Sequence, residues 1–389
     1  MHDDIYMLWL SSLVHQVGSR KLNFLLDAFG SAGAIFKSST DELREHMPKA
    51  HHAFDFMCKH KNLEYIETLL KKMESKGIVY ISRNNPRFPS LLKEIPDPPA
   101  GIFFIGTLPA DDTQKVAIIG SRKCSEYGLL TARLLAQPLA AAGIVIVSGM
   151  ARGVDSMAHR GALQGGGLTI AVLGCGVDIC YPAENRELRS QIIQNGCVMS
   201  EYAPDVRPAP AFFPARNRII SGLSRAVVVT EADVKSGTLI TVDQAQEQGR
   251  EVLAVPGSIT NNLSRGTNQL IRDGAFPVGD YEDILNVLGS PPKPSNISKP
   301  NNTRKPKSTS KSVPSAQDLP KSPQIPKNSN ISLAPDEKRV YDRLSLEPVS
   351  FDYLADVSEV DIGRLHLICT GLELKGLAKK LPGARYIKN

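Results

Sequence analysis

Five short apolar runs constrain the fold of this chain more than any other feature of its sequence. The runs are rich in β-branched residues, and each ends in a glycine, serine or acidic turn. Runs that are apolar at nearly every position are typical of strands in a parallel sheet, because helices bury both faces of such a sheet. They span residues 116–119, 144–147, 168–173, 226–229 and 251–255.

Helical stretches alternate with these runs. Residues 129–142 and 239–248 have the apolar spacing of amphipathic helices, although Pro138 lies within the first and should bend its last turn. Strands that alternate with helices indicate a doubly wound, mostly parallel α/β sheet. We therefore expect residues 78–288 to form a Rossmann-like domain.

Residues 1–77 have a different pattern. Apolar residues recur there every three or four positions, Gly18 and Ser19 interrupt the repeat, and Gly30 ends the second helix. The pattern indicates a small helical domain of the SAM or helix-hairpin-helix type. In DNA-binding hairpins of this type a second glycine brings backbone N–H groups to a phosphate, and Arg20 stands at that position here. Packing is therefore favoured over DNA contact for this domain.

The C-terminal part of the chain is divided in two. Residues 289–334 consist mainly of Pro, Ser, Asn and Lys, which is typical of a disordered linker. Residues 335–389 resume an apolar pattern, with three helices followed by a hairpin that turns at Pro382 and Gly383. That order is typical of a winged helix. Its third helix carries both acidic and basic residues, so protein docking is as plausible there as DNA reading.

Charge is concentrated in the linker. Between Ser290 and Ala334 there are eight basic residues and one acidic residue, a net +7 against +6 for the whole chain, which leaves −1 for the rest. A nucleic-acid site on the folded parts must therefore be a local basic cluster.

Several protein classes are disfavoured. No apolar stretch approaches the roughly 18–20 residues of a membrane span, and the acidic amino terminus does not resemble a secretory signal. Six cysteines without a CxxC pair are typical of reduced thiols, so we expect a cytoplasmic protein. We expect no metal and no cofactor, because the histidines and cysteines lack zinc-ligand spacing and the GxxxxGK[ST] and HExxH motifs are absent from the sequence. The dinucleotide pattern that starts at Gly174 fails at Ile179, and Asp155 with His159 is interpreted as a structural pair on one helix face.

Four turns carry the candidate site. Because ligands of parallel sheets bind beyond the carboxyl ends of the strands, we expect these turns to meet at one edge. Glycine permits close approach of the backbone, Ser and Thr donate hydrogen bonds, and Arg and Lys attract phosphate. The candidate residues are Gly120, Ser121, Arg122, Gly149, Arg152, Phe213, Arg216, Asn217, Arg218, Lys235, Ser236 and Thr238.

The third turn is the most informative of the four. Arg216 and Arg218 are predicted at or near a helix start, where cations oppose the helix dipole unless an anion lies nearby. The alternative is an internal ion pair with an acidic residue at the same sheet edge. Phe212 and Phe213 offer faces for base stacking, although burial is expected for one of them. Ser236 is predicted to cap the next helix.

These blocks of sequence resemble the DNA-processing protein A family of bacteria, also called Smf. The matching segments include VAIIGSRKCSEYG, VSGMARGVDSMAHRGAL, FFPARNRIISGLSRAVVVTEADVKSGTLIT and REVLAVPGSITNNLSRGTNQLIRDGA, and they cover residues 115–276. The resemblance implies a protein without catalytic residues that binds and protects single-stranded DNA during natural transformation. It also implies a homodimer formed through the Rossmann-like domain and a partnership with the RecA recombinase.

Two other functions remain open. Phosphoribohydrolases of the LOG type share this style of sheet and carry PGGxGTxxE, but Thr241 stands here where their glutamate would be. A transcription regulator would act through the winged helix, with the sheet as a ligand sensor.

Overall fold

The five predicted runs are strands of one sheet. In the computed structural model they are β3 (Lys115–Ile119), β4 (Val145–Ser148), β5 (Thr169–Val172), β7 (Ala226–Val229) and β8 (Glu251–Ala254). The structure describes residues 2–48, 51–289, 334–344, 348–358, 360–375, 377–381 and 385–388. All strand residues of β3, β4, β5 and β7 are buried, which explains their uniformly apolar sequences.

Four further strands complete the sheet, which has the order β1-β2-β6-β5-β4-β3-β7-β8-β9. They are β1 (Val79–Ser82), β2 (Gly101–Gly106), β6 (Gly196–Ser200) and β9 (Phe276–Pro277). The strands from β6 to β9 are parallel, and β1 and β2 add an antiparallel edge. The chain progresses outward from β3 to β6 and then returns to the other side of β3 with β7. The topological switch point therefore lies between β3 and β7.

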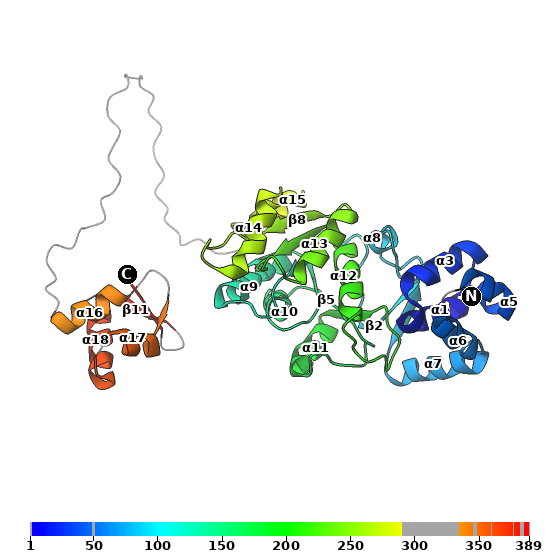
Figure 1. Ribbon diagram of the computed structural model, residues 1–389, viewed down its shortest axis with the longest axis horizontal. Coiled ribbons are helices and arrows are strands. Elements are labelled where there is room, and N and C mark those ends of the chain that lie inside the picture. The colour runs from blue at the N-terminus through cyan, green and yellow to red at the C-terminus, as the bar shows by residue number, and fades with distance from the viewer. Residues whose placement is uncertain are drawn as a thin grey trace, which may run out of the picture. The chain divides into compact units, whose positions relative to one another are not determined.

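Side chains alternate between the two faces of the sheet. Val116 and Ile118 of β3 pack with α9 (Glu126–Ala141) and α10 (Val154–Gln164). Ala117 and Ile119 of the same strand pack with α12 (Phe212–Gly222) and α13 (Thr238–Glu247). The other helices of this domain among the described residues are α8 (Ser90–Lys93), α11 (Arg186–Gln194), α14 (Arg265–Arg272) and α15 (Tyr281–Val287), with short 3-10 helices at Ala183–Asn185 and Asn262–Ser264. Figure 1 shows the doubly wound arrangement, which confirms the predicted fold class. Helix α9 continues through Pro138 to Ala141.

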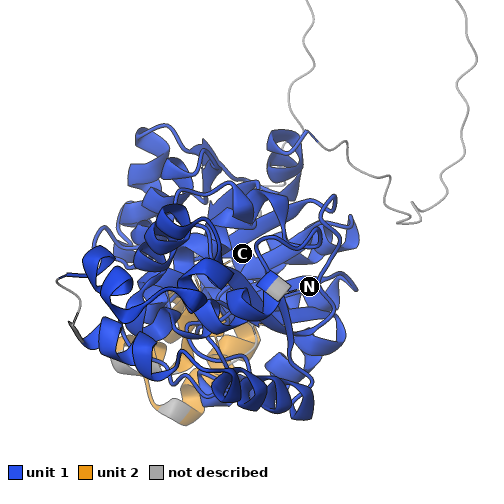
Figure 2. Ribbon diagram, turned by 90° about the vertical axis from the view of Figure 1, so that its right-hand side faces the viewer, with its two compact units in different colours: residues 1–299 blue, residues 300–389 orange. Residues whose placement is uncertain are grey.

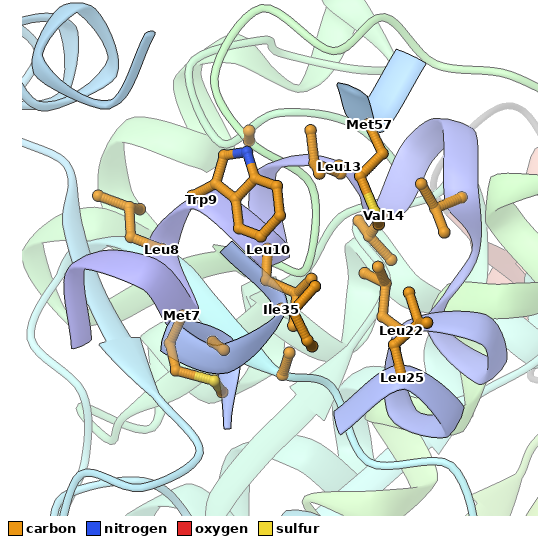
Figure 3. Close-up of a cluster of buried hydrophobic side chains, with 14 of the residues drawn as sticks. Met7, Leu8, Trp9, Leu10, Leu13, Val14, Leu22, Leu25, Ile35 and Met57 are labelled. Atoms are coloured by element: carbon orange, nitrogen blue, oxygen red, sulfur yellow. The ribbon is translucent and has the colours of Figure 1, made fainter. Parts of the chain in front are cut away.

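Among the described residues, seven helices precede the sheet. They are α1 (His2–Ser12), α2 (Val14–Val17), α3 (Ser19–Phe29), α4 (Ala32–Lys37), α5 (Thr40–His46), α6 (His51–Lys59) and α7 (Leu63–Ser75). As predicted, Gly18 separates two helices and Gly30 ends one; both have positive φ, +83° and +78°. Figure 3 shows Trp9, Leu13 and Ile35 in the core of this bundle.

The helical bundle and the sheet share one hydrophobic cluster. It extends from the bundle to Phe103 of β2 and to Tyr202, which follows β6. The chain accordingly divides into two compact units, residues 1–299 and residues 300–389, coloured in Figure 2. A separate domain boundary at residues 77 and 78 stays a prediction.

The second unit is the predicted winged helix. Helices α16 (Pro335–Arg343), α17 (Phe351–Ser358) and α18 (Ile362–Leu374) pack with a sheet of order β10-β12-β11. Its strands are β10 (Val349–Ser350), β11 (Ala378–Leu381) and β12 (Arg385–Lys388). The predicted linker, except for its two end residues, and the turn at Pro382 and Gly383 lie outside the described residues.

Candidate nucleic-acid interface

A cleft opens at the switch point of the sheet. The loops that follow β3 and β7, together with the start of α12, enclose a volume of about 640 Å³. Eight of the candidate residues line it: Gly120, Ser121, Arg122, Phe213, Arg216, Asn217, Ser236 and Thr238. This is the place where sheets of this topology bind ligands, because adjacent strands there send their connections in opposite directions.

Glycines allow the loops of the cleft to approach each other closely. A Cβ atom on Gly120 would lie 2.7 Å from Cγ2 of Val154 and 3.0 Å from the carbonyl oxygen of Glu231. Gly153 has a φ of +76°, and a Cβ there would lie 2.5 Å from the carbonyl oxygen of Ser121. Both positions therefore require glycine for the packing of these loops.

A buried carboxylate fixes the loop that follows β3. Glu231, which is fully buried, accepts hydrogen bonds from the backbone N–H of Ser125 at 2.8 Å and from its hydroxyl at 2.5 Å. The carbonyl oxygen of Glu231 accepts a third from the N–H of Ser121 at 2.8 Å. The carboxylate of Glu231 is therefore occupied by Ser125 and has a structural role. It forms no ion pair with any described arginine or lysine at the cleft.

Three exposed cations surround the cleft. Arg122 and Lys123 line it, and Lys235 stands exposed one residue before the lining residue Ser236. The guanidinium carbon of Arg122 lies 5.3 Å from the centre of the Phe213 ring. Within the described part of the chain, no carboxylate forms an ion pair with any of these three residues. They are free to attract an anionic ligand.

Two aromatic rings meet at the cleft. The ring centres of Phe213 and Tyr181 are 5.5 Å apart, and Tyr181 is 45% exposed. Phe212 points elsewhere, because it stacks on Tyr202 with ring centres 4.4 Å apart. The sequence led us to expect one of the two phenylalanines to be buried, but both are partly exposed; Phe212 packs against the core of the helical bundle.

Arg216 reaches the cleft from within the protein. It is 4% exposed, and its Nη1 donates to the carbonyl oxygens of Gly149, at 2.8 Å, and of Val172, while its Nε donates to Asn217 Oδ1 at 3.2 Å. Among the described residues, none accepts a hydrogen bond from Nη2 of Arg216. Burial lowers the pKa of this guanidinium, and Asp155 opposes that effect. A buried cation with a free donor beside a cleft is suited to bind an anion.

The side chain of Arg218 does not lie at the cleft, where the sequence analysis expected it. It is 7% exposed, donates to Glu201 Oε1 at 2.7 Å and to Asp97 Oδ2 at 3.2 Å, and lines a different cavity from the cleft. Burial alone would lower its pKa, but the carboxylates of Glu201 and Asp97 outweigh burial and the pKa is raised. The internal ion pair that the sequence left open is therefore its arrangement, and we exclude Arg218 from the interface.

The start of α12 also differs from the prediction. The helix begins at Phe212, so Arg216 and Arg218 lie in its second turn and not at its first residues. The helix dipole acts mainly on the first turn, so it does not explain why arginines stand here. Hydrogen bonds explain their presence instead: Arg216 donates to backbone carbonyl oxygens, and Arg218 donates to carboxylates.

Gly149 and Arg152 line a small cavity beside the cleft. Its volume is about 40 Å³, and it shares Arg122, Phe213 and Arg216 with the cleft. A Cβ on Gly149 would lie 2.6 Å from both terminal nitrogens of Arg216, so glycine is required for the arginine to fit. The side chain of Arg152 is 66% exposed and pairs with Glu184.

The start of α13 forms the opposite wall of the cleft. The residue that caps the helix is Gly237 and not Ser236. Ser236 nevertheless accepts a hydrogen bond from the N–H of Thr238 at 3.2 Å and donates to its hydroxyl at 2.9 Å. The predicted capping role is therefore displaced by one residue, and both hydroxyls remain at the cleft.

Asp155 and His159 do not form the predicted pair. Asp155 lines the cleft and accepts from the N–H of Ala151 at 3.3 Å; burial raises its pKa, and Arg216 opposes the increase. The Nδ1 of His159 lies 2.7 Å from the hydroxyl of Thr169 in the core. Neither residue belongs to a metal cluster, since the described residues contain no group of three candidate ligands.

With this geometry established, the comparisons with known proteins identify the family. The sequence model described as DNA recombination-mediator protein A matches residues 79–289, and one described as the DprA winged helix domain matches residues 324–384. The chain belongs to the DNA recombination-mediator protein A family. The resemblance seen in the sequence is confirmed.

Two relatives match over most of their own length. Protein Smf of Synechocystis is 34% identical over 325 residues, which is 82% of each chain. DNA processing protein DprA of Streptococcus pneumoniae is 44% identical over 216 residues, covering 53% of this chain and 76% of the relative. The solved structure of the S. pneumoniae protein superposes with a TM-score of 0.62 at 36% identity, over 74% of this chain and 97% of that chain.

The sequence analysis missed one cation and one aromatic ring of the cleft, Lys123 and Tyr181. Lys123 directly follows the predicted Arg122, so its proximity was a usable signal. Tyr181 belongs to the connection between β5 and α11, and nothing in its local sequence indicates that it reaches Phe213.

None of the helices among the described residues is long and apolar enough to cross a membrane.

Proposed function

We propose that this chain binds single-stranded DNA in the cleft at the switch point of its sheet. The observation that carries the proposal is the convergence there of the exposed cations Arg122 and Lys123, the buried donor Arg216 and the paired rings of Tyr181 and Phe213. Cations that follow a backbone, combined with rings on which bases stack, are the common elements of single-strand binding. An unpaired base has a free face for such a ring, whereas a base in a duplex is already stacked.

The wider role follows from family membership. We propose that the protein acts in the cytoplasm as a homodimer that protects incoming single strands during natural transformation and helps to load RecA. The family description as a recombination mediator supports this role. The cleft supports only the DNA contact, whereas the dimer, the protection of DNA and the loading of RecA are proposed from family membership.

A salt titration of oligothymidine affinity tests the proposal. Arg122→Ala and Lys123→Ala should each weaken binding, and each should flatten the dependence of log affinity on log salt by about 0.7 if one phosphate contact is lost. Sequence preference should not change, because phosphate contacts carry no base information. Arg160→Ala is the matched control, since Arg160 is exposed on α10 and lines no described cavity. Unchanged affinity in both cleft variants would place the DNA elsewhere.

The enzymatic alternative has less support. Thr241 lines the cleft where a phosphoribohydrolase of the LOG type would need a glutamate, and the carboxylate that does line it, Asp155, is buried and accepts from the N–H of Ala151. We propose that the protein is not an enzyme. Incubation with AMP should release no adenine, and release that disappears in Thr238→Ala would support the enzyme instead.

A further inference from the structure

A second cavity lies beside the segment that leads into α12. It encloses about 530 Å³ between the N-terminal helices α2, α6 and α7 and the segment of residues 203–209. Four of its lining residues have aromatic or imidazole rings: His15, Phe56, Tyr65 and Phe212. We call it the bundle cavity. The proposed cleft function does not use it.

The rings of the bundle cavity are partly exposed and fixed in place. His15 and Phe56 pack edge to face with ring centres 5.3 Å apart, and the hydroxyl of Tyr65 donates to Ser12 Oγ at 3.1 Å. Burial lowers the pKa of His15, so its ring is neutral at pH 7.5. Fixed aromatic faces that remain open to solvent lose little entropy when a planar ligand stacks on them.

The charge at the rim of this cavity is positive. Lys72 and Lys76 form ion pairs with Asp205, and Lys76 also pairs with Asp178. Arg207 is exposed, and among the described residues none forms an ion pair with it. Three cations against two carboxylates leave one net positive charge, carried by a guanidinium that is free to bind an anion.

One short segment forms a wall of both the bundle cavity and the cleft. Ala209 and Phe212 line the bundle cavity, whereas Pro210 and Phe213 line the cleft. Adjacent residues thus line two different cavities, and this segment is a wall that the two cavities share. A flexible chain ligand that leaves the cleft has to cross only this segment to reach the second set of rings.

We propose that the bundle cavity is a second binding position for the same single strand, in which a base stacks on its rings and Arg207 contacts the backbone phosphate. This inference rests on the proposed function of the cleft. A strand in both positions would contact the N-terminal helices through the rings of His15 on α2, Phe56 on α6 and Tyr65 on α7, and not through the N–H of Gly18, which donates to the carbonyl oxygen of Val14. The N-terminal bundle would then take part in DNA binding without a helix-hairpin-helix contact.

The dependence of affinity on oligonucleotide length tests this path. Oligothymidines of increasing length would be titrated onto the full chain carrying Arg207→Ala, with Arg272→Ala as the control, because Arg272 is exposed on α14 and lines neither cavity. The shortest oligomers that bind should have unchanged affinity, since they fill only the cleft. Longer oligomers should bind about fivefold more weakly and lose about 0.7 of their salt slope.

Photocrosslinking locates the contact directly. An oligothymidine with one 5-iododeoxyuridine should crosslink to Tyr181 or Phe213 when the modified base occupies the cleft, and to Tyr65, Phe56 or His15 when it lies further along the strand. Crosslinks confined to the cleft, or an Arg207→Ala effect equal at all lengths, would overturn the second position and leave the cleft intact. If neither set of rings crosslinks and short oligomers do not bind, the cleft proposal itself fails.

Discussion

The buried imidazole of His159 makes the stability of the sheet domain sensitive to mild acid. The hydroxyl of Thr169 donates its proton to the carbonyl oxygen of Ile146 at 2.7 Å, so His159 Nδ1 must be the donor in its 2.7 Å contact with that hydroxyl. The other ring nitrogen, Nε2, is buried and has no partner among the described residues. A second proton would therefore sit on a buried atom without an acceptor, and burial, assisted by the charge of Arg216, lowers the pKa of His159 to about 3.

The dependence of the free energy of unfolding on pH follows from the difference in proton binding between the folded and the unfolded chain. The unfolded chain gains a proton on this residue as the pH falls below the ordinary value of 6.5, whereas the folded chain stays neutral. The contribution of His159 to the free energy of unfolding is thus fully present above pH 6.5 and is lost progressively as the pH falls toward 3. Between pH 7.5 and pH 5.5 the free energy of unfolding should fall by about 1.4 kcal/mol from this residue alone, one tenfold change in the equilibrium constant.

The assay is urea unfolding at both pH values, followed by the fluorescence of Trp9. Trp9 is the only tryptophan of the chain and is buried in the same compact unit as His159. His159→Gln should lose about 1.4 kcal/mol less than the unaltered protein over this interval. His52→Gln, at an exposed position, serves as the control. Equal losses in the His159→Gln variant and the unaltered protein would refute the reasoning.

Three further predictions concern the cleft and α12. Gly149→Ala should displace the guanidinium of Arg216, because the new Cβ would lie 2.6 Å from it, and should reduce oligothymidine affinity at least about tenfold at one salt concentration. Phe213→Leu should cost about 1–3 kcal/mol of binding free energy with little change in melting temperature. Phe212→Leu should lower the melting temperature, because its ring stacks on Tyr202, and should leave the affinity for the shortest oligothymidines unchanged, because these fill only the cleft. Anisotropy would measure the affinities and calorimetry the melting temperatures. Arg218→Ala should destabilise the protein by about 3–5 kcal/mol in urea unfolding, because it leaves its buried carboxylate partners unpaired; a loss below about 1 kcal/mol would contradict the buried ion pair.

The sequence predicted the centre of the sheet better than its edge. Strands buried on both faces have continuous β-branched runs, and all five of these were found. Strand β2, which lies between β1 and β6, reads GIFFIG, and β6 reads GCVMS; each has few β-branched residues and begins with a glycine, so neither has a distinctive pattern. The position of the cleft was predictable because the carboxyl ends of parallel strands meet at one edge.

The sequence did not separate the roles of Arg216 and Arg218, although helix geometry gives a clue. Residues two apart on an α-helix point about 200° from each other, so both guanidinium groups cannot enter one cleft. Which of them does so depends on what packs on each side of α12. The positions of Glu201 and Asp97, both distant in the chain, decide that question. Tyr181 was missed for the same reason, because its contact with Phe213 is made in three dimensions only.

Asp97 connects helix α12 to helix α3 of the N-terminal bundle by hydrogen bonds. Its side chain accepts hydrogen bonds from Arg218 on α12 and from Ser19 and Asn23 on α3. Arg216, one half-turn away on the same helix, holds the carboxyl ends of β4 and β5. We therefore expect a ligand that immobilises α12 in the cleft to oppose the opening of α3 as well, and by reciprocity the opening of α3 would weaken binding of that ligand by the same free energy.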